Sequence, residues 1–167
     1  IHNPISEGML STGDDIPVTI TDEGVYYNKK KDRSIDANSF CMRDFHNKYV
    51  KRKLIKAVSN RGDTLIDFAV GKAGDMPKWI DAKLDFVFGI DISPDNIDNV
   101  MDGAYARYLN LRRDLKVMPK ALYVNGNSGK NIKSGDGLFS EKDKMITNAV
   151  FGEGPKDATK LGKGVYN

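Results

Sequence analysis

The stretch DFAVGKAGDMPKWI, residues 67–80, decides the fold of this chain. A short apolar run leads into a loop that contains Gly71 and Gly74, and a short helical segment follows the loop. Asp75 is expected to cap that helix, and Pro77 is tolerated in a first helical turn. Because glycine lets the backbone approach a ligand closely, the loop is a candidate binding loop.

Three compact apolar runs predict buried strands, namely TLIDFAV at 64–70, FVFGIDI at 86–92 and ALYVN at 121–125. A short helix is predicted between the first two runs, with Trp79 covering the sheet. Between the second and third runs, one long amphipathic stripe predicts core residues, and these are Ile97, Val100, Met101, Ala104, Tyr108, Leu111 and Leu115. The alternation predicts an α/β fold, half of a doubly wound parallel sheet with helices on its faces.

The flanking sequence is less regular. Residues 1–38 are rich in Gly, Pro, Asp and Thr without a sustained period, which predicts an extended N-terminal arm or linker. A helix is predicted from Ser39 to about Asn60, with an apolar repeat at Val50, Leu54, Ala57 and Val58. After Asn125 the sequence is polar and glycine-rich, and no element is predicted there. Since the chain opens on Ile1 and stops in the polar stretch GPKDATKLGKGVYN, we expect a piece of a longer polypeptide.

Composition excludes several classes of protein. The chain has 167 residues and no apolar run near the roughly 20 residues of a membrane span, nor an N-terminal targeting pattern, so we expect a soluble intracellular protein without a membrane partner. One cysteine, Cys41, and two histidines exclude a disulfide framework and a Cys-rich zinc site, and no metal site is expected.

Positive charge is concentrated in one segment. Residues 28–56 hold ten Lys or Arg residues against three Asp residues, while the whole chain has a net charge of +3. Two interpretations stay open, a solvated helix face and a surface that binds phosphates.

The loop details indicate which cofactor fits. Asp67 lies near the end of the first strand, and Asp91 ends the second, where an acid accepts hydrogen bonds from a ribose diol. Ala69 stands where a dinucleotide fingerprint needs glycine, which disfavours NAD, and GNSGKN at 126–131 fails the P-loop pattern. The arrangement suits S-adenosylmethionine, which has an amino acid end and a ribose.

Two segments carry a family resemblance. DFAVGKAGDMPKW at 67–79 resembles the motif DLxCGKGGDLxKW of mRNA cap guanine-N7 methyltransferases, and MRDFHNKYVKRKLI at 42–55 resembles the family helix LRNFHNxxKxxLI. NGNSGKNIKSGDGLF at 125–139 is similar to a segment of the capping enzymes of large DNA viruses. The resemblance implies a Rossmann-like class I methyltransferase fold, with residues 39–167 as the N-terminal part of the domain, truncated before a fourth strand.

The resemblance also implies roles for individual residues. Lys51 would contact the methionine end of S-adenosylmethionine, Asp67 would lie beneath its ammonium, and Asp91 would bind its ribose diol. The full cofactor set would be Lys51, Asp67, Ala69, Gly71, Asp91, Asn127 and Ser128, and the cap-contacting set would be His46, Asn47, Lys72, Lys78 and Arg107. The implied partners are a capped mRNA 5′ end, further capping-enzyme domains of the same chain, and a small stimulatory subunit.

The same residues also allow interpretations that involve no ligand. His46 fits a packed core histidine, Lys51, Lys72 and Lys78 fit surface lysines, and Asp91 fits a turn before the next helix. A noncatalytic RNA-binding or regulatory module, and a methyltransferase for another substrate, remain alternatives. For N7 methylation no catalytic side chain is expected, because N7 presents a free lone pair and loses no proton. The chain tested alone is expected to be inactive.

Overall fold

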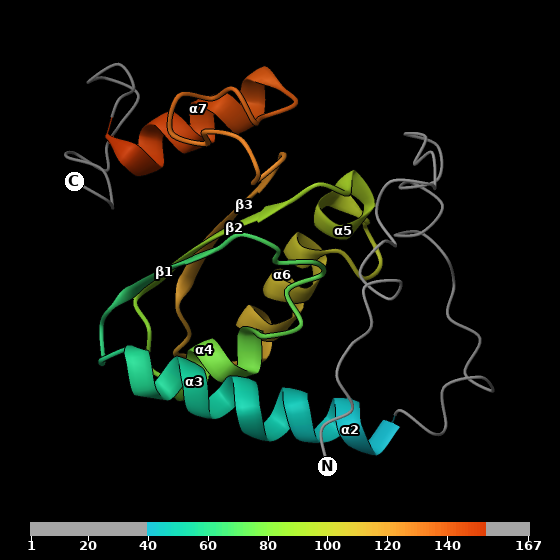
Figure 1. Cartoon of the computed structure of the whole chain (residues 1–167), viewed down its shortest axis with the longest axis vertical. Coiled ribbons are helices and arrows are strands. Elements are labelled where there is room, and N and C mark those ends of the chain that lie inside the picture. The colour runs from blue at the N-terminus through green and yellow to red at the C-terminus, as the bar shows by residue number, and fades with distance from the viewer. Residues whose placement is uncertain (1–39, 153–167) are drawn as a thin grey trace, which may run out of the picture. The chain divides into compact units, whose positions relative to one another are not determined.

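The computed structural model describes residues 40–152, which all belong to residues 33–167, one of the two units into which the chain divides. The predicted arm at 1–38 and the polar stretch at 154–167 lie outside the described residues. Within residues 40–152, a parallel sheet carries helices on both of its faces (Figure 1).

The sheet contains the three predicted strands. They are β1 (Thr64–Asp67), β2 (Phe86–Asp91) and β3 (Lys120–Asn125), in the order β1-β2-β3, and both pairs are parallel. All six residues of the central strand β2 are buried, as expected for a strand covered on both faces. The prediction of an α/β fold with half of a doubly wound sheet is confirmed.

Alternating side chains build a separate core on each face of the sheet. Val87 and Tyr123 belong to one hydrophobic cluster, whereas Phe88 and Val124 belong to the other. This is the period-two alternation of a strand, here with apolar residues on both sides. Both faces of the sheet are therefore covered, and a binding site is expected at the ends of the strands.

The helices are distributed over the two faces. Their bounds are α2 (Phe40–Phe45), η3 (His46–Val50), α3 (Lys51–Val58), α4 (Met76–Asp81), α5 (Pro94–Asp98), α6 (Ala104–Asp114) and α7 (Glu141–Phe151). In Figure 1, α3, α4 and α6 lie on one side of the sheet and α7 on the other. The predicted helix at 39–60 is present as α2, η3 and α3 in direct succession, with one π-helical segment in its middle. Trp79 on α4 is 1% exposed, so its predicted role in the core is confirmed.

The predicted stripe between β2 and β3 is broken into two helices, which is a correction. Asn99 interrupts it, because its side chain donates to Asp95 and accepts from the backbone amides of Met101 and Asp102. Gly103 then packs so closely that an added Cβ would lie 2.6 Å from the Asn99 carbonyl oxygen. Val100 and Met101 are 87% and 82% exposed, so the prediction that they are core residues is wrong. Leu115, beyond the end of α6, is also exposed, whereas Ile97 and Ala104 are buried.

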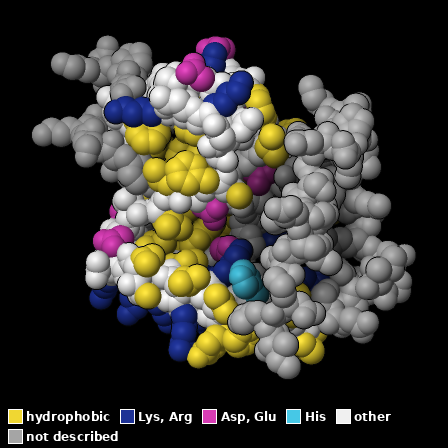
Figure 2. All heavy atoms as spheres, in the orientation of Figure 1, with side chains coloured by type: hydrophobic (Ala, Val, Ile, Leu, Met, Phe, Trp, Pro, Cys, Tyr) yellow, Lys and Arg dark blue, Asp and Glu magenta, His cyan; other side chains and the backbone are white. Residues whose placement is uncertain are grey.

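The apolar repeat on α3 is also more exposed than predicted. Leu54 and Val58 are 59% and 76% exposed, Ala57 is exposed, and only Ile55 packs against the core cluster. Figure 2 shows hydrophobic side chains gathered at the surface over β1 and α3. The reason is that β1 is an edge strand of the described sheet, so no further described strand covers this side of the helix.

Helix α7 was not predicted. It begins after Ser140, whose hydroxyl oxygen accepts a hydrogen bond from the Asp143 backbone amide at 3.1 Å. It ends at Gly152, which adopts the left-handed conformation with φ of 73°. Val150 and Thr147 are buried on the second face of the sheet. The polar, glycine-rich composition after Asn125 hid this short amphipathic pattern.

Candidate functional site

Two hydrogen bonds fix the loop after β1 to the end of β2, one to a backbone carbonyl and one to a side-chain carboxylate. The Val70 amide donates to the Ile90 carbonyl at 3.0 Å, and the Gly71 amide donates to Asp91 Oδ2 at 2.8 Å. Gly71 has φ of +54°, a conformation that L-residues other than glycine rarely adopt. The loop predicted to bind a cofactor is therefore fixed at the carboxyl ends of the strands, where ligands bind in sheets of this kind.

The carboxylate of Asp91 is buried and almost fully engaged. Its Oδ2 accepts from Gly71, and its Oδ1 accepts from the Ser93 amide and from Asn96 Nδ2, each at 2.9 Å. A carboxylate offers about four acceptor positions. The described hydrogen bonds take three of these positions and leave one, on Oδ2. Asp91 is thus more than a turn residue, because its carboxylate connects the loop after β1 to the segment after β2.

A cavity of about 400 Å³ opens beside this loop, and we name it the candidate cavity. It gathers seven of the twelve residues predicted for the cofactor and the cap. Its lining residues are Asn47, Lys51, Ala69, Val70, Gly71, Lys72, Gly74, Asp75, Lys78 and Arg107. Residues from η3, α3, α4, α6 and the loop after β1 thus meet in one place although they are far apart in the sequence.

Asp75 holds two of the lysines of the candidate cavity. Its Oδ2 accepts from Lys51 Nζ at 2.9 Å, and its Oδ1 accepts from Lys78 Nζ. Burial alone would raise the pKa of Asp75, but the hydrogen bonds from Lys78 and Lys51 outweigh it and lower that pKa below its ordinary value. Lys78 is 7% exposed, so its interpretation as an ordinary surface lysine is wrong. Asp75 stands at the start of α4 but makes no side-chain cap, contrary to the prediction.

Lys72 is held by two carboxylates from the segment after β2. Its Nζ lies 2.7 Å from Asp102 Oδ1 and 3.2 Å from Asp95 Oδ2, and the hydrogen bond to Asp102 raises the pKa of Lys72. Arg107 Nη1 donates to the Lys72 carbonyl oxygen at 3.4 Å. The assignment of Arg107 thus has geometric support, since it reaches the same loop from α6.

Asp67 lies beside the candidate cavity rather than in it. It lines an adjacent cavity of about 290 Å³ that shares Lys51 and Asp75 with the first. Asp67 Oδ1 accepts from the Ala69 amide at 3.1 Å. Burial raises the pKa of Asp67, and the Ala69 hydrogen bond only partly offsets this.

Four other predicted residues do not line the candidate cavity, and one of them is Asp91, which contacts the lining loop through the Gly71 amide. His46 is exposed, so the interpretation as a packed histidine is wrong. Asn127 follows β3, and its side-chain Oδ1 accepts from the Gly129 amide at 2.9 Å. Its neighbour Ser128 is exposed. Gly126 connects this loop to the site, since its amide donates to the Asp91 carbonyl oxygen at 2.9 Å.

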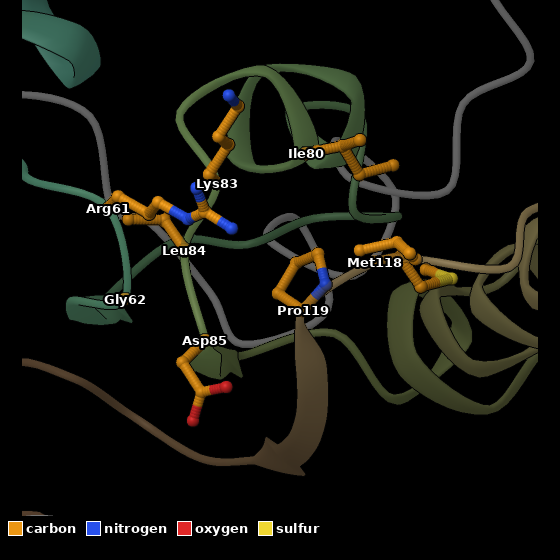
Figure 3. A pocket seen from close by; sticks show the side chains of 9 residues that line it. Arg61, Gly62, Ile80, Lys83, Leu84, Asp85, Met118 and Pro119 are labelled. Carbon is orange, nitrogen blue, oxygen red and sulfur yellow. The ribbon is translucent and has the colours of Figure 1, made fainter.

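A further cavity of about 430 Å³ lies at the opposite end of the sheet, where the strands begin. Figure 3 shows Ile80, Met118 and Pro119 on one side of it and Arg61 and Lys83 on the other. None of the residues predicted for the cofactor or the cap lines it. In parallel sheets of this type ligands bind at the carboxyl ends of strands, so the chemistry of the site does not involve this cavity.

Sequence reasoning missed the three carboxylates that pair with the lysines, Asp75, Asp95 and Asp102. Asp75 was assigned to helix capping, although its place three residues before Lys78 allowed an ion pair on one helical turn. Asp102 is 30 residues from Lys72 in the sequence, and no local pattern signals that contact.

Comparison with known proteins decides the family. A profile of the mRNA (guanine-N(7))-methyltransferase domain matches residues 22–135, which is more than half of the chain. The chain belongs to the mRNA (guanine-N7)-methyltransferase family. The match includes the loop after β1 and every residue that lines the candidate cavity, so the family resemblance is confirmed.

Relatives of the family are found in a giant virus and in plants. The chain is 28% identical over 139 residues to a "Probable mRNA-capping enzyme" of Acanthamoeba polyphaga mimivirus, which covers 77% of this chain and 12% of that protein. It is 38% identical over 55 residues to "mRNA cap guanine-N(7) methyltransferase 1" of Oryza sativa subsp. japonica, covering 33% of this chain and 15% of that protein. The chain thus spans a small part of the length of the curated relatives it matches.

Between residues 40 and 152, no helix is long and apolar enough to cross a membrane.

Proposed function

We propose that the protein transfers a methyl group from S-adenosylmethionine to guanine N7 of an mRNA 5′ cap. The observation that carries this proposal is the candidate cavity, which brings residues of the expected cofactor set and of the expected cap set together. Lys51, Ala69 and Gly71 belong to the first set, and Asn47, Lys72, Lys78 and Arg107 belong to the second. A group-transfer site needs both ligands within bonding distance of each other.

The residues present fit S-adenosylmethionine. The open acceptor position on Asp91 Oδ2 suits one ribose hydroxyl, and the Gly71 backbone leaves room, since no atom lies within 4 Å of an added Cβ. Lys51 offers an ammonium to the cofactor carboxylate, and Asp67 offers a carboxylate to its ammonium. Asn127 would face the adenine, with Oδ1 sharing its lone pairs between Gly129 and the base.

The cap side carries positive charge that is paired before a ligand binds. Lys72 is held by Asp95 and Asp102, and Lys78 is held by Asp75. A triphosphate would compete with these carboxylates for the lysines, which makes cap binding dependent on ionic strength. Asn47 supplies an amide that can donate to and accept from the guanine edge.

The chemistry asks little of the side chains. When bound, S-adenosylmethionine would supply a methyl group carried on a sulfonium sulfur. The guanine N7 lone pair would form the new N–C bond, and the electron pair of the broken C–S bond would remain on the sulfur. Because N7 loses no proton, no general base is required. The residues of the candidate cavity then act by orientation and charge, and orientation contributes up to about 7–11 kcal/mol in favourable systems.

The test is transfer of a labelled methyl group from S-adenosylmethionine to capped RNA by the full-length protein. A matched acceptor carries a carbon in place of guanine N7, and we expect transfer to the ordinary cap and none to this analogue. Equal labelling of both acceptors would indicate a methyltransferase for another position or substrate. Binding of capped RNA without any transfer would indicate a noncatalytic module and contradict the proposal.

Other domains of the same polypeptide belong to the proposal as well. Because the chain matches 12% of the mimivirus capping enzyme, we propose that it works beside other capping activities, and a small stimulatory subunit is a further candidate partner.

A further inference from the structure

We propose that Asp75 is a positioning residue which sets the places of the cofactor-side Lys51 and the cap-side Lys78 at once. The proposal rests on the proposed function, which assigns those two lysines to different ligands. Asp75 uses one oxygen for each lysine, with Oδ2 on Lys51 of α3 and Oδ1 on Lys78 of α4. One carboxylate thus connects two helices and both halves of the candidate cavity.

Because the Lys78 ammonium group is buried, it needs the Asp75 carboxylate as a partner of opposite charge. The Lys78 side chain is 9% exposed and that of Asp75 is 21% exposed, whereas that of Lys51 is 40% exposed. A buried ammonium without a nearby opposite charge is strongly disfavoured. Without Asp75, Lys78 would leave its place in the wall of the cavity, and Lys51 would lose the contact that orients it.

Charge state adds support to the geometry. Hydrogen bonds from the two lysines overcome the effect of burial and hold the pKa of Asp75 below its ordinary value. Asp75 therefore stays a carboxylate at neutral pH, and each lysine retains a partner on one of its oxygens.

A positioning role makes a specific prediction about the two ligands. Replacing Lys51 should weaken the cofactor alone, and replacing Lys78 should weaken the cap alone. Replacing Asp75 should weaken both, since both ammonium groups depend on it. If Asp75 only stabilised helix α4, replacing it would lower the stability of the protein without weakening both ligands.

The experiment uses the full-length protein with Asp75→Asn, Asp75→Glu, Lys51→Met and Lys78→Met. Dissociation constants are measured for S-adenosylmethionine and for the cap analogue GpppG, and thermal unfolding is followed in parallel. Asp75→Asn should raise both dissociation constants at least tenfold, and Asp75→Glu should recover part of each. In the Lys51→Met background, Asp75→Asn should add little further loss of cofactor affinity.

The matched control is Asp81→Asn on the same helix. Asp81 also joins α4 to α3, through Arg52 Nη1 at 3.0 Å, but it does not line the candidate cavity. We expect Asp81→Asn to leave both dissociation constants within twofold of the wild type. Equal effects of Asp75→Asn and Asp81→Asn would overturn the proposal, as would an Asp75→Asn protein that binds both ligands normally.

Failure of the proposed function gives a different result. The wild-type protein would then fail to bind S-adenosylmethionine, GpppG or both, and the positioning role would be decided without ligands. The nitrogen resonances of Lys51 Nζ and Lys78 Nζ should both move in Asp75→Asn and stay in place in Asp81→Asn. Unchanged lysine resonances in Asp75→Asn would refute the positioning of the lysines by Asp75.

Discussion

The carboxylate of Asp91 at the end of β2 accepts a hydrogen bond of 2.8 Å from the backbone amide of Gly71 in the loop after β1. One side chain thus fixes the loop that the sequence predicts as the cofactor loop. The same carboxylate accepts from Ser93 and Asn96, so it also fixes the start of the next segment. The geometry of the candidate cavity depends on this residue even before a ligand is present.

Asp91→Asn should weaken cofactor binding and reduce stability together. The amide nitrogen that replaces one oxygen is a donor facing donors, and losing a buried acceptor costs about 1–3 kcal/mol. We expect the dissociation constant for S-adenosylmethionine, measured by calorimetry, to rise about tenfold or more. Asp98→Asn on the exposed side of α5 is the control, with an effect within about 0.5 kcal/mol. Unchanged cofactor affinity in Asp91→Asn would remove this residue from the site.

Asp67→Asn should stabilise the protein while it weakens the cofactor complex. Burial raises the pKa of Asp67 above 3.8, so folding favours the protonated acid. The contribution of this group to stability is therefore present below pH 3.8 and lost as the pH rises through the higher folded pKa. Asparagine is neutral and keeps an oxygen for the Ala69 amide, so thermal unfolding at pH 7 should occur at a higher temperature. A lower unfolding temperature would contradict this account.

Cofactor affinity of Asp67→Asn should fall at the same time. Loss of a charged acceptor for the cofactor ammonium should cost about tenfold in the dissociation constant. Affinity equal to that of the wild type would show that Asp67 does not face the ammonium.

Asp102→Asn should strengthen binding of a cap analogue by releasing Lys72. Pairs of this exposure contribute about 0.2–1 kcal/mol, so the gain should be about 1.4- to fivefold at low salt and smaller at high salt. The pKa of Lys72 is raised above 10.5, so its ion pair is intact below that pH and is lost only as the pH rises through the folded pKa. Release therefore needs substitution rather than a change of pH in the neutral range.

Two controls separate this effect from a general change of charge. Asp114→Asn removes the same charge far from Lys72 in the sequence, at a carboxylate that is 69% exposed. It should change cap affinity less than Asp102→Asn. In a Lys72→Ala background the gain from Asp102→Asn should disappear, and a gain that persists there would show that Lys72 is not involved.

Gly89→Ala should destabilise the sheet beneath the cofactor loop. An added Cβ would lie 2.8 Å from Tyr123 Cδ1 and 2.8 Å from Val70 Cγ2, so the ring or the loop must move. Such overpacking costs about 1–3 kcal/mol, measurable by urea unfolding. Gly74→Ala is the control, because the nearest atom to its Cβ is Arg107 Nη1 at 4.0 Å. Similar stabilities of the two variants would show that the packing of Tyr123 does not require glycine at position 89.

The strands could be predicted because each is a local pattern. Phe86–Asp91 reads as a continuous apolar run, and such runs arise in strands covered on both faces. The break after α5 could not be read in the same way. It depends on the Asn99 side chain, which satisfies backbone groups at Met101 and Asp102, and apolar spacing alone continues through it. Val100 and Met101 keep helical spacing but lie outside the helices.

Seven of the twelve predicted site residues meet in the candidate cavity, but the ion pairs within it could not be predicted from the sequence. Lys51, Lys72 and Lys78 were identified through the two motifs, and the structure brings all three to one cavity. Their carboxylate partners follow from contacts between separate elements. Lys51 meets Asp75 across 24 residues of sequence, so the charge balance of the cavity appears only when the chain is folded.

The π-helical segment η3 explains how a helix can hold an extra residue. In the motif LRNFHNxxKxxLI two residues separate Asn from Lys, whereas three residues, 48–50, separate Asn47 from Lys51 here. The Lys51 amide bonds to the His46 carbonyl, a wide turn that takes up one inserted residue. Asn47 and Lys51 consequently both line the candidate cavity. One inserted residue between the two side chains is thus accommodated, whereas an insertion inside α3 would rotate Lys51 against the residues that follow it.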